Sequence, residues 1–184
     1  MTDRMPPLPP EDLTPPQASA AAAFASDRGT PVFGPFVPLL RSPELMLHLQ
    51  RVGAHCRYGS AIGLRLTEFT ILLVARRLDQ SVEWAIHAPI AAEAGVAEAT
   101  IAAILEGRRP TGMQEDEALV FDAIHELWDA SGWSDPTYAA VLSRYGEMGV
   151  IDLVCTVGYY TTLAMVMNVA RTDAPGGFRM PRLP

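Results

Sequence analysis

The stretch LTEFTILLVARRLDQSVEWAIHAPIAAEAG, residues 66–95, decides the fold that this sequence predicts. Its first half predicts a helix, because Glu68, Leu72 and Ala75 recur at steps of three and four and apolar residues fill most of the remaining circumference. A short connection at residues 79–81 leads into a second helix, so the two helices are expected to return antiparallel. The predicted fold class is therefore all-α, a compact helical domain built around an antiparallel helical hairpin.

The second helix of this hairpin carries a candidate acid–base pair. Glu83 and His87 stand four residues apart, which stacks them on one helical face where they can share a proton. Pro89 cannot donate a hydrogen bond to the carbonyl of Ala85, so it is expected to bend the helix or disturb its last turns. The antiparallel return is expected to bring Glu68 towards the pair. Buried clusters of acids and an imidazole are sites where pKa values are driven apart.

The composition limits the class of protein. A chain of 184 residues with 49% hydrophobic and 19% charged residues is long enough for one well-buried domain. Its formal net charge of −7 and the lack of a basic stripe argue against a nucleic-acid partner. All 14 basic residues are arginine, which excludes a lysine Schiff base and the lysine of a phosphate-binding P-loop.

The cysteines and the N-terminal residues indicate the compartment. Cys56 and Cys155 lie far apart and neither belongs to a Cys-x-x-Cys pair, so neither a disulfide scaffold nor a zinc knuckle is indicated. Both are expected to be small buried hydrophobes in a reducing compartment. A secretory signal peptide is not expected, because prolines crowd the first residues. The predicted localisation is cytoplasmic.

The chain is predicted to have three segments. Residues 1–30, rich in proline and alanine, predict an extended N-terminal arm that is disordered or lies over a neighbour. Residues 31–172 form the helical domain, and residues 173–184 form a C-terminal loop. Capping residues and apolar periodicity predict further helices at about 42–58, 97–106 and 114–130, and a short one from Ser134.

Residues 149–171 are apolar nearly all round. Asp152, Thr156 and Asn168 interrupt this stretch, and no uninterrupted apolar run reaches the ~20 residues that a bilayer requires. The stretch is therefore expected to be a buried helix and not a membrane span. A helix that is apolar on every side in a small protein often needs a partner subunit, and Gly158 permits the close approach of a neighbouring backbone.

Several of these strings resemble the carboxymuconolactone decarboxylase family within the alkylhydroperoxidase-D-like superfamily. The resemblance covers roughly residues 33–170. The strings that carry it are TEFTILLVARR at 67–77, VEWAIHAPIAAEAGV at 82–96 and EGRRP at 106–110, with GPF at 34–36, SPEL at 42–45 and RYG at 57–59 upstream.

The resemblance also identifies the branch. Peroxidase members of that superfamily carry Cys-x-x-Cys-x-x-x-His with a glutamate upstream. Here His87 matches the histidine and Glu68 the upstream glutamate, while Gln80 and Glu83 stand at the two cysteine positions. The resemblance therefore implies the branch without the dithiol, in which an all-helical protomer assembles into a homotrimer or homohexamer.

Each candidate residue has a structural interpretation beside the functional one. Glu68 could instead pair with Arg65 or face Arg76, and His87 could be a hydrogen-bonded core histidine. Three further residues, Arg57, Tyr58 and Trp84, are candidates for substrate binding, although an arginine at a helix end and aromatic residues have routine structural roles. No metal site is expected, because di-iron bundles use Glu-x-x-His and Glu83 is four residues from His87.

The resemblance implies a cofactor-free lyase that acts on a small carboxylated or carbonyl-bearing ring compound, as in the catabolism of aromatic compounds. Loss of CO₂ next to an electron-accepting group leaves a dienolate that must be stabilised and then protonated. His87 is expected to supply the proton, with Glu83 orienting it. The alternatives are isomerisation or cyclisation by the same pair, a non-catalytic ligand-binding or structural protein, and a peroxidase-type relative without the dithiol.

Overall fold

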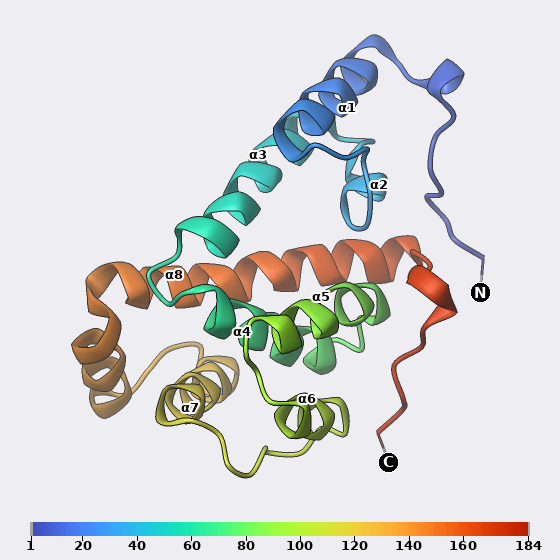
Figure 1. Cartoon of the computed structure of the whole chain (residues 1–184). Helices are drawn as coiled ribbons and strands as arrows, with labels where there is room; N and C mark the ends of the chain where they lie inside the picture. Colours follow the sequence, from blue (N-terminus) through green and yellow to red (C-terminus); the bar gives the residue numbers. More distant parts are fainter. Residues whose placement is uncertain (1, 184) are drawn as a thin grey trace.

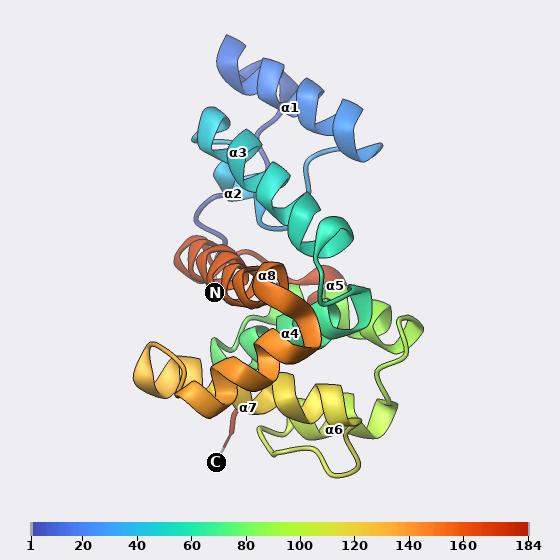
Figure 2. The same cartoon turned by 90° about the vertical axis from the view of Figure 1, so that its left-hand side faces the viewer.

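The computed structural model describes residues 2–183, and every regular element in that range is a helix, which confirms the all-α prediction. Helix α8 runs across the middle of the molecule, with α1–α3 on one side of it and α4–α7 on the other (Figure 1; Figure 2). The main helices after the N-terminal ones are α4 (Leu64–Arg77), α5 (Ser81–Glu93), α6 (Glu98–Leu105), α7 (Glu115–Ala130) and α8 (Asp135–Ala170).

Helix α4 is the centre of the packing, in contact with α5, α6, α7 and α8. All eleven residues from Leu66 to Arg76 are buried, so the helix has no solvent-facing side over three turns. Its buried hydroxyls are satisfied, because Thr67 donates to the Cys56 carbonyl at 3.2 Å and Thr70 to the Leu66 carbonyl at 2.7 Å. The one buried carboxylate on this stretch, Glu68, needs partners from other elements.

A tight turn joins α4 to α5 and gives the predicted hairpin. Asp79 adopts a left-handed φ of 50° and accepts a hydrogen bond from Arg76. Gln80 then caps α5, because its side-chain oxygen accepts from the Val82 amide at 2.6 Å and its amide group donates to Asn168 of α8 at 2.8 Å. Helix α5 continues past Pro89 to Glu93, so the expected disturbance does not end the helix.

The N-terminal segment differs from the predicted extended arm. A short turn η1 (Pro10–Asp12) precedes helix α1 (Pro15–Arg28), which starts with a capping box between Thr14 and Gln17. The helix packs on α3 and buries Ala20 and Phe24. Proline is compatible with the first turn of a helix, and alanine has the highest helix propensity, so the composition that suggested an arm also suits a capped helix.

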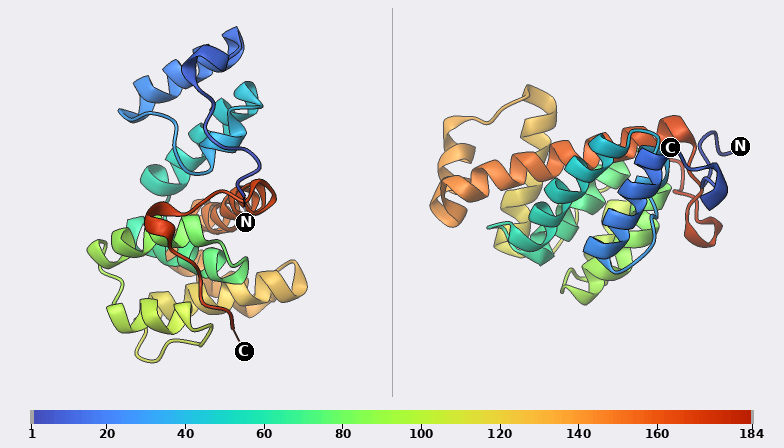
Figure 3. Two further views of the ribbon diagram at one scale, coloured as in Figure 1. Left: turned by 90° about the vertical axis from the view of Figure 1, so that its right-hand side faces the viewer. Right: turned by 90° about the horizontal axis from the view of Figure 1, so that it is seen from above.

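Two short elements connect this N-terminal helix to the hairpin. Helix α2 (Phe36–Leu39) and helix α3 (Pro43–Ala54) both contact α8. Figure 3 shows α1 and α3 side by side above α8. Helix α3 ends in a π-helical turn, η2 (His55–Gly59), close to the predicted end of this helix.

Helix α8 bends at Gly146, whose φ of 69° and ψ of −178° suit only glycine. By length and composition the helix could cross a membrane, with a mean hydropathy of 1.6 over its most apolar window, but 56% of that window is buried inside the protein. The core helices of globular proteins can be equally long and apolar. One cysteine prediction is wrong, because Cys155 on this helix is exposed, whereas Cys56 is buried.

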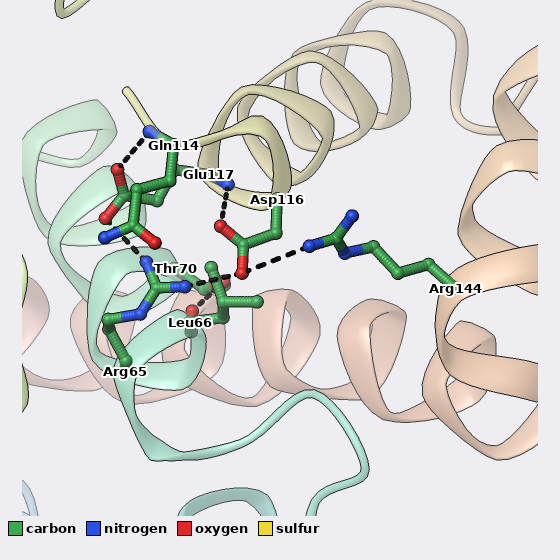
Figure 4. Close-up of polar contacts among 7 residues, drawn as sticks. All are labelled: Arg65, Leu66, Thr70, Gln114, Asp116, Glu117 and Arg144. Atoms are coloured by element: carbon green, nitrogen blue, oxygen red, sulfur yellow. Dashed lines mark hydrogen bonds and ion pairs between the residues drawn. The ribbon is translucent and has the colours of Figure 1, made fainter. Parts of the chain in front are cut away.

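A group of ion pairs fixes the start of α4 to the start of α7 (Figure 4). Arg65 donates to Asp116 at 2.5 Å and to Glu117 at 2.7 Å, and Arg144 of α8 lies 3.7 Å from Asp116. Glu117 also closes the capping box of α7 by accepting from the Gln114 amide at 2.9 Å. Arg65 therefore pairs with residues of α7 and not with Glu68. The Arg65–Glu68 pair was the structural alternative that the sequence left open.

The C-terminal loop returns along the hairpin. Its only regular turn in the described range is η3 (Pro175–Gly177). The Met180 amide donates to the Ser81 hydroxyl at 3.0 Å, and Arg76 donates to the Pro181 carbonyl at 2.9 Å. The loop thus covers the turn between α4 and α5.

Truncating Phe24 tests whether α1 belongs to the core. Phe24 is fully buried between Phe33 and Phe36, with ring centroids 6.0 and 4.8 Å away. Phe24→Ala is expected to lower the free energy of unfolding by about 3–5 kcal/mol in urea denaturation. Ser26→Ala, on an exposed position of the same helix, should change it by less than about 0.5 kcal/mol. Equal effects of the two substitutions would support a dispensable arm.

Candidate active site

The structure brings together four ionisable side chains around Glu68. Its Oε2 lies 2.6 Å from His87 Nδ1, and its Oε1 accepts a hydrogen bond from Arg57 Nε at 3.1 Å and lies 3.0 Å from Arg57 Nη2. The other imidazole nitrogen, Nε2, lies 3.2 Å from Glu83 Oε2. The sequence-predicted trio of Glu68, Glu83 and His87 is therefore one cluster, and Arg57 belongs to it as a partner of Glu68.

The side chains of this cluster are buried, so each of their charges needs a partner of opposite sign. The side chains of Glu68, Glu83 and His87 are 0%, 3% and 7% exposed, and that of Arg57 is 18% exposed. A buried charge is tolerated only when it is paired, since desolvation would otherwise cost several kcal/mol. Two carboxylates balance one guanidinium and one imidazolium, so the cluster is neutral when His87 is protonated.

His87 is an imidazolium at neutral pH. Burial by itself disfavours the charged form, but hydrogen bonds to Glu68 and Glu83 outweigh it and raise the pKa of His87 to about 9. Both ring N–H groups then donate, one to each glutamate. The shorter contact at Nδ1 fixes the ring on Glu68, and the longer contact at Nε2 leaves that proton the more available of the two.

The π-helical turn η2 positions Arg57. His55 Nε2 lies 2.8 Å from Asp152 Oδ1, and the Ala61 amide donates to Asp152 Oδ2 at 2.8 Å, so one buried carboxylate of α8 holds both sides of the turn. At Gly59 a Cβ would lie 2.9 Å from the His55 ring, so the turn has no room for a side chain there. Single π-helical turns are frequent at functional sites.

A cavity of about 170 Å³ adjoins the cluster. Glu83, His87 and Arg57 form its polar side, and Tyr160 sets its ring edge-on to the imidazole with centroids 5.4 Å apart. Oxygen Oε1 of Glu83 is buried and has no hydrogen-bond partner among the described residues. The rest of the lining is mostly apolar or aromatic and comes from the N-terminal elements, α5 and α8: Phe33, Pro35, Phe36, Ile86, Ile90, Tyr159 and Leu163, with Gly53 and Arg28.

Two of the residues predicted to bind substrate, Tyr58 and Trp84, lie outside the cavity. The Tyr58 side chain projects away from the protein, with 70% of the residue exposed, and Arg57 lies over its ring at 5.1 Å. Trp84 is buried in the hydrophobic core and does not line the cavity. Gln80, at the first cysteine position of the peroxidases, caps α5. The structure therefore gives these three residues packing or capping roles.

The sequence did not predict several residues that line the cavity. Tyr159 and Tyr160 are adjacent in a helix that is apolar nearly all round, which suggested only a buried helix. Burial raises the pKa of both phenols above the usual value. Gly53 makes room for one of them, since a Cβ there would lie 2.3 Å from the Tyr159 hydroxyl. Arg28 stood in the segment interpreted as an arm.

A larger hollow of about 500 Å³ lies between the C-terminal end of α4 and α7. Three of its four arginines, Arg76, Arg108 and Arg109, are paired with the surface acids Asp79, Glu106 and Asp122, and the fourth, Arg77, lies over the ring of Trp128. Ion pairs of this kind are common on solvated faces. Among residues 2–183, no group of three or more histidine, cysteine, aspartate or glutamate side chains is arranged to hold a metal ion.

The raised pKa of His87 makes stability depend on pH. Its contribution is fully present below the unfolded value of 6.5 and is lost as the pH rises through about 9. The advantage of the wild type over His87→Gln in free energy of unfolding should therefore shrink between these values, by on the order of 3 kcal/mol. Urea denaturation from about pH 6 to about pH 10 measures it. His48→Gln, which removes an exposed imidazole, is the control; a loss no larger than its own would contradict the buried ion-pair assignment.

Comparisons with known proteins do not extend the local resemblance. No family model, curated protein or solved structure matches the chain.

Proposed function

We propose that this protein is a carboxymuconolactone decarboxylase-like enzyme that carries out cofactor-free acid–base chemistry on a small carboxylated or carbonyl-bearing ring compound. The observation that supports this most is a buried imidazolium, His87, that lies beside the carboxylate of Glu83 in the wall of a cavity. A histidine that only packs in a core needs no such cavity. Clefts with a few convergent polar groups and perturbed pKa values are the usual setting of acid–base catalysis.

The proposed reaction begins with a substrate carboxylate next to an electron-accepting group. The bond between the ring carbon and the carboxylate breaks, CO₂ leaves, and the electron pair moves into the adjacent acceptor to give a dienolate. The imidazolium of His87 stabilises this charge and donates the proton of Nε2 to carbon. A water molecule then returns a proton to the neutral imidazole, and the hydroxide left over is taken up by CO₂ as bicarbonate. Because a dienolate is far more basic than a group with a pKa of about 9, the transfer is downhill.

The two glutamates have different parts in this proposal. Glu68 holds Nδ1 at 2.6 Å and thereby sets the ring orientation and supports its charge. Glu83 shares the proton of Nε2 and forms part of the cavity wall. Arg57 pairs with Glu68 on the side away from the imidazole.

A ligand-binding protein without catalysis is the second candidate. It is favoured by the neutrality of the cluster, whose four charges balance in the absence of any ligand. Thiol peroxidase chemistry finds no support, because Gln80 and Glu83 occupy the dithiol positions and neither cysteine lines the cavity. The cytoplasm is the proposed location, on the cysteine usage already described.

We also propose that the protein is a homo-oligomer. One face of α8 after its bend, here called the α8 seam, is solvent-exposed and carries no charged side chain: Met148, Ile151, Cys155, Gly158, Thr162, Met165 and Val169. These positions recur at steps of three and four, the pattern of a helix that packs along another helix. The resemblance implies a homotrimer or a homohexamer of two trimers, and a hexamer of that kind contains two-fold contacts.

The α8 seam suits a two-fold contact with a second copy. Gly158 stands at its middle with nothing within 4 Å of where a Cβ would be, and an antiparallel copy would bring the two glycines together. The same crossing would set Ile151 beside Met165 of the second copy. The larger side chains lie towards the two ends, where crossing helices diverge and space is greater.

Kinetics and melting together test the acid–base pair. A screen of lactone acids for CO₂ release supplies the substrate, and His87→Gln should then lower kcat by about 10²–10⁴-fold because the proton donor is lost. Glu83→Gln should also slow the reaction and displace its pH profile. Glu93→Gln, an exposed position on the same helix, should leave kcat unchanged. A His87→Gln protein that melts early yet turns over normally per folded molecule would rule out His87 and Glu83 as the acid–base pair, whereas a wild type that releases CO₂ from no compound of the screen would favour the ligand-binding alternative.

Mass measurements test the α8 seam. Ile151→Arg places a charge in the seam and should dissociate the oligomer to the protomer mass of 19.9 kDa in light scattering at micromolar concentration. Tyr138→Arg, an exposed apolar residue of α8 before the bend, should leave the oligomer intact. A wild-type protein that is already a monomer under these conditions would rule out the assembly.

A further inference from the structure

Arg28 lies in the wall of the cavity next to the candidate active site. It is the last residue of α1, and its guanidinium stands near the rings of Phe24 and Phe36, 5.8 and 5.5 Å from their centroids. Its Nη2 donates to the Gln50 carbonyl of α3 at 3.0 Å. Arginine is more weakly hydrated than lysine and stacks on aromatic rings, so it can remain charged in such a partly buried place.

Arg28 is the cation of the cavity that lacks an anion. Arg57 and His87 are both neutralised by Glu68 and Glu83. In the part of the chain that the structure describes, no carboxylate lies within ion-pair distance of Arg28, which forms none of the salt bridges found there. The acid next to it in sequence, Asp27, accepts instead from the Gln50 side chain at 2.5 Å. The cavity wall therefore holds one unbalanced positive charge.

The lining of the cavity suits a ligand with two features, an anionic group and a small ring. The guanidinium of Arg28 presents N–H donors to an anion, and a planar carboxylate matches its geometry. The remaining walls are apolar or aromatic, and a volume of about 170 Å³ limits the ligand to a small ring.

We propose that Arg28 binds a carboxylate of the substrate and that α1 is thereby part of the active site. This inference rests on the proposed function, since it assumes that the cavity beside His87 is where substrate binds. It assigns a binding role to the segment that the sequence predicted to be an extended arm. The hydrogen bond from Gln50 engages Asp27, so this neighbouring acid does not neutralise Arg28.

Binding of benzoate and of its neutral analogue benzamide tests this assignment without any turnover. Dissociation constants are measured by ligand-observed NMR for the wild type and for Arg28→Gln, Arg28→Lys and Arg51→Gln. Arg51 is an exposed arginine of α3 without a side-chain partner among the described contacts, so its substitution makes the same change of charge outside the cavity. Shifts of the His87 and Tyr160 ring signals on addition of benzoate locate the ligand in the cavity.

The wild type should prefer benzoate to benzamide. Arg28→Gln should weaken benzoate binding by about 10- to 100-fold and leave benzamide nearly unchanged, because one charge-assisted contact is lost. Arg28→Lys should recover part of the loss, since it keeps the charge without the planar guanidinium. Arg51→Gln should behave as the wild type. Unchanged melting temperatures show that the variants are folded.

Two results would overturn the assignment. One is a wild type that binds benzamide as well as benzoate, and the other is an Arg28→Gln protein that keeps the preference for benzoate. These outcomes differ from a failure of the proposed function. If Arg28→Gln loses the preference but no lactone acid releases CO₂, the carboxylate site stands and the reaction is wrong; if CO₂ is released with the same KM by Arg28→Gln, the reaction stands and the carboxylate site is wrong.

Discussion

The burial of one carboxylate, Glu68, is the constraint on which the rest of the site depends. It lies in the middle of a helix with no exposed side, so both of its oxygens must find partners from other elements. One oxygen takes Arg57 from the π-helical turn, and the other takes His87 from the second hairpin helix. A single charge thus fixes the relative positions of η2, α4 and α5, and any change to one partner leaves an unpaired charge in the interior.

The same pairing is what gives the cavity its chemistry. An imidazole between two carboxylates stays protonated at neutral pH, while the guanidinium on the far side of Glu68 keeps the whole cluster neutral. The stabilising role and the proposed catalytic role of these residues are therefore not alternatives at the level of structure. They are separated by what lines the cavity, where Glu83 and His87 form part of the wall and Arg28 keeps a charge without a counter-ion.

The sequence predicted the features that depend on residues a few positions apart. The spacing of Glu83 and His87 on one face depends only on helical geometry, and the short connection at Asp79 allowed the return that brings Glu68 beside them. It was uninformative for Arg28, Tyr159 and Tyr160, because their place in the cavity depends on how α1 and α8 pack against the hairpin. Tyr58 was predicted to bind substrate but is 70% exposed and does not line the cavity, because the direction in which a side chain leaves a turn depends on how the turn packs.

The sequence by itself determined the helical class, the hairpin and the acid–base trio, because apolar periodicity, capping residues and i,i+4 spacing act within a few residues. Only the tertiary structure decided that Arg57 neutralises Glu68, that Arg65 is held by α7, and that the proline- and alanine-rich N-terminal segment forms a helix with a residue at the cavity wall. Those facts join residues from different helices and turns, and they follow from which buried surfaces and charges fit one another, a matter that composition and spacing along the chain do not encode.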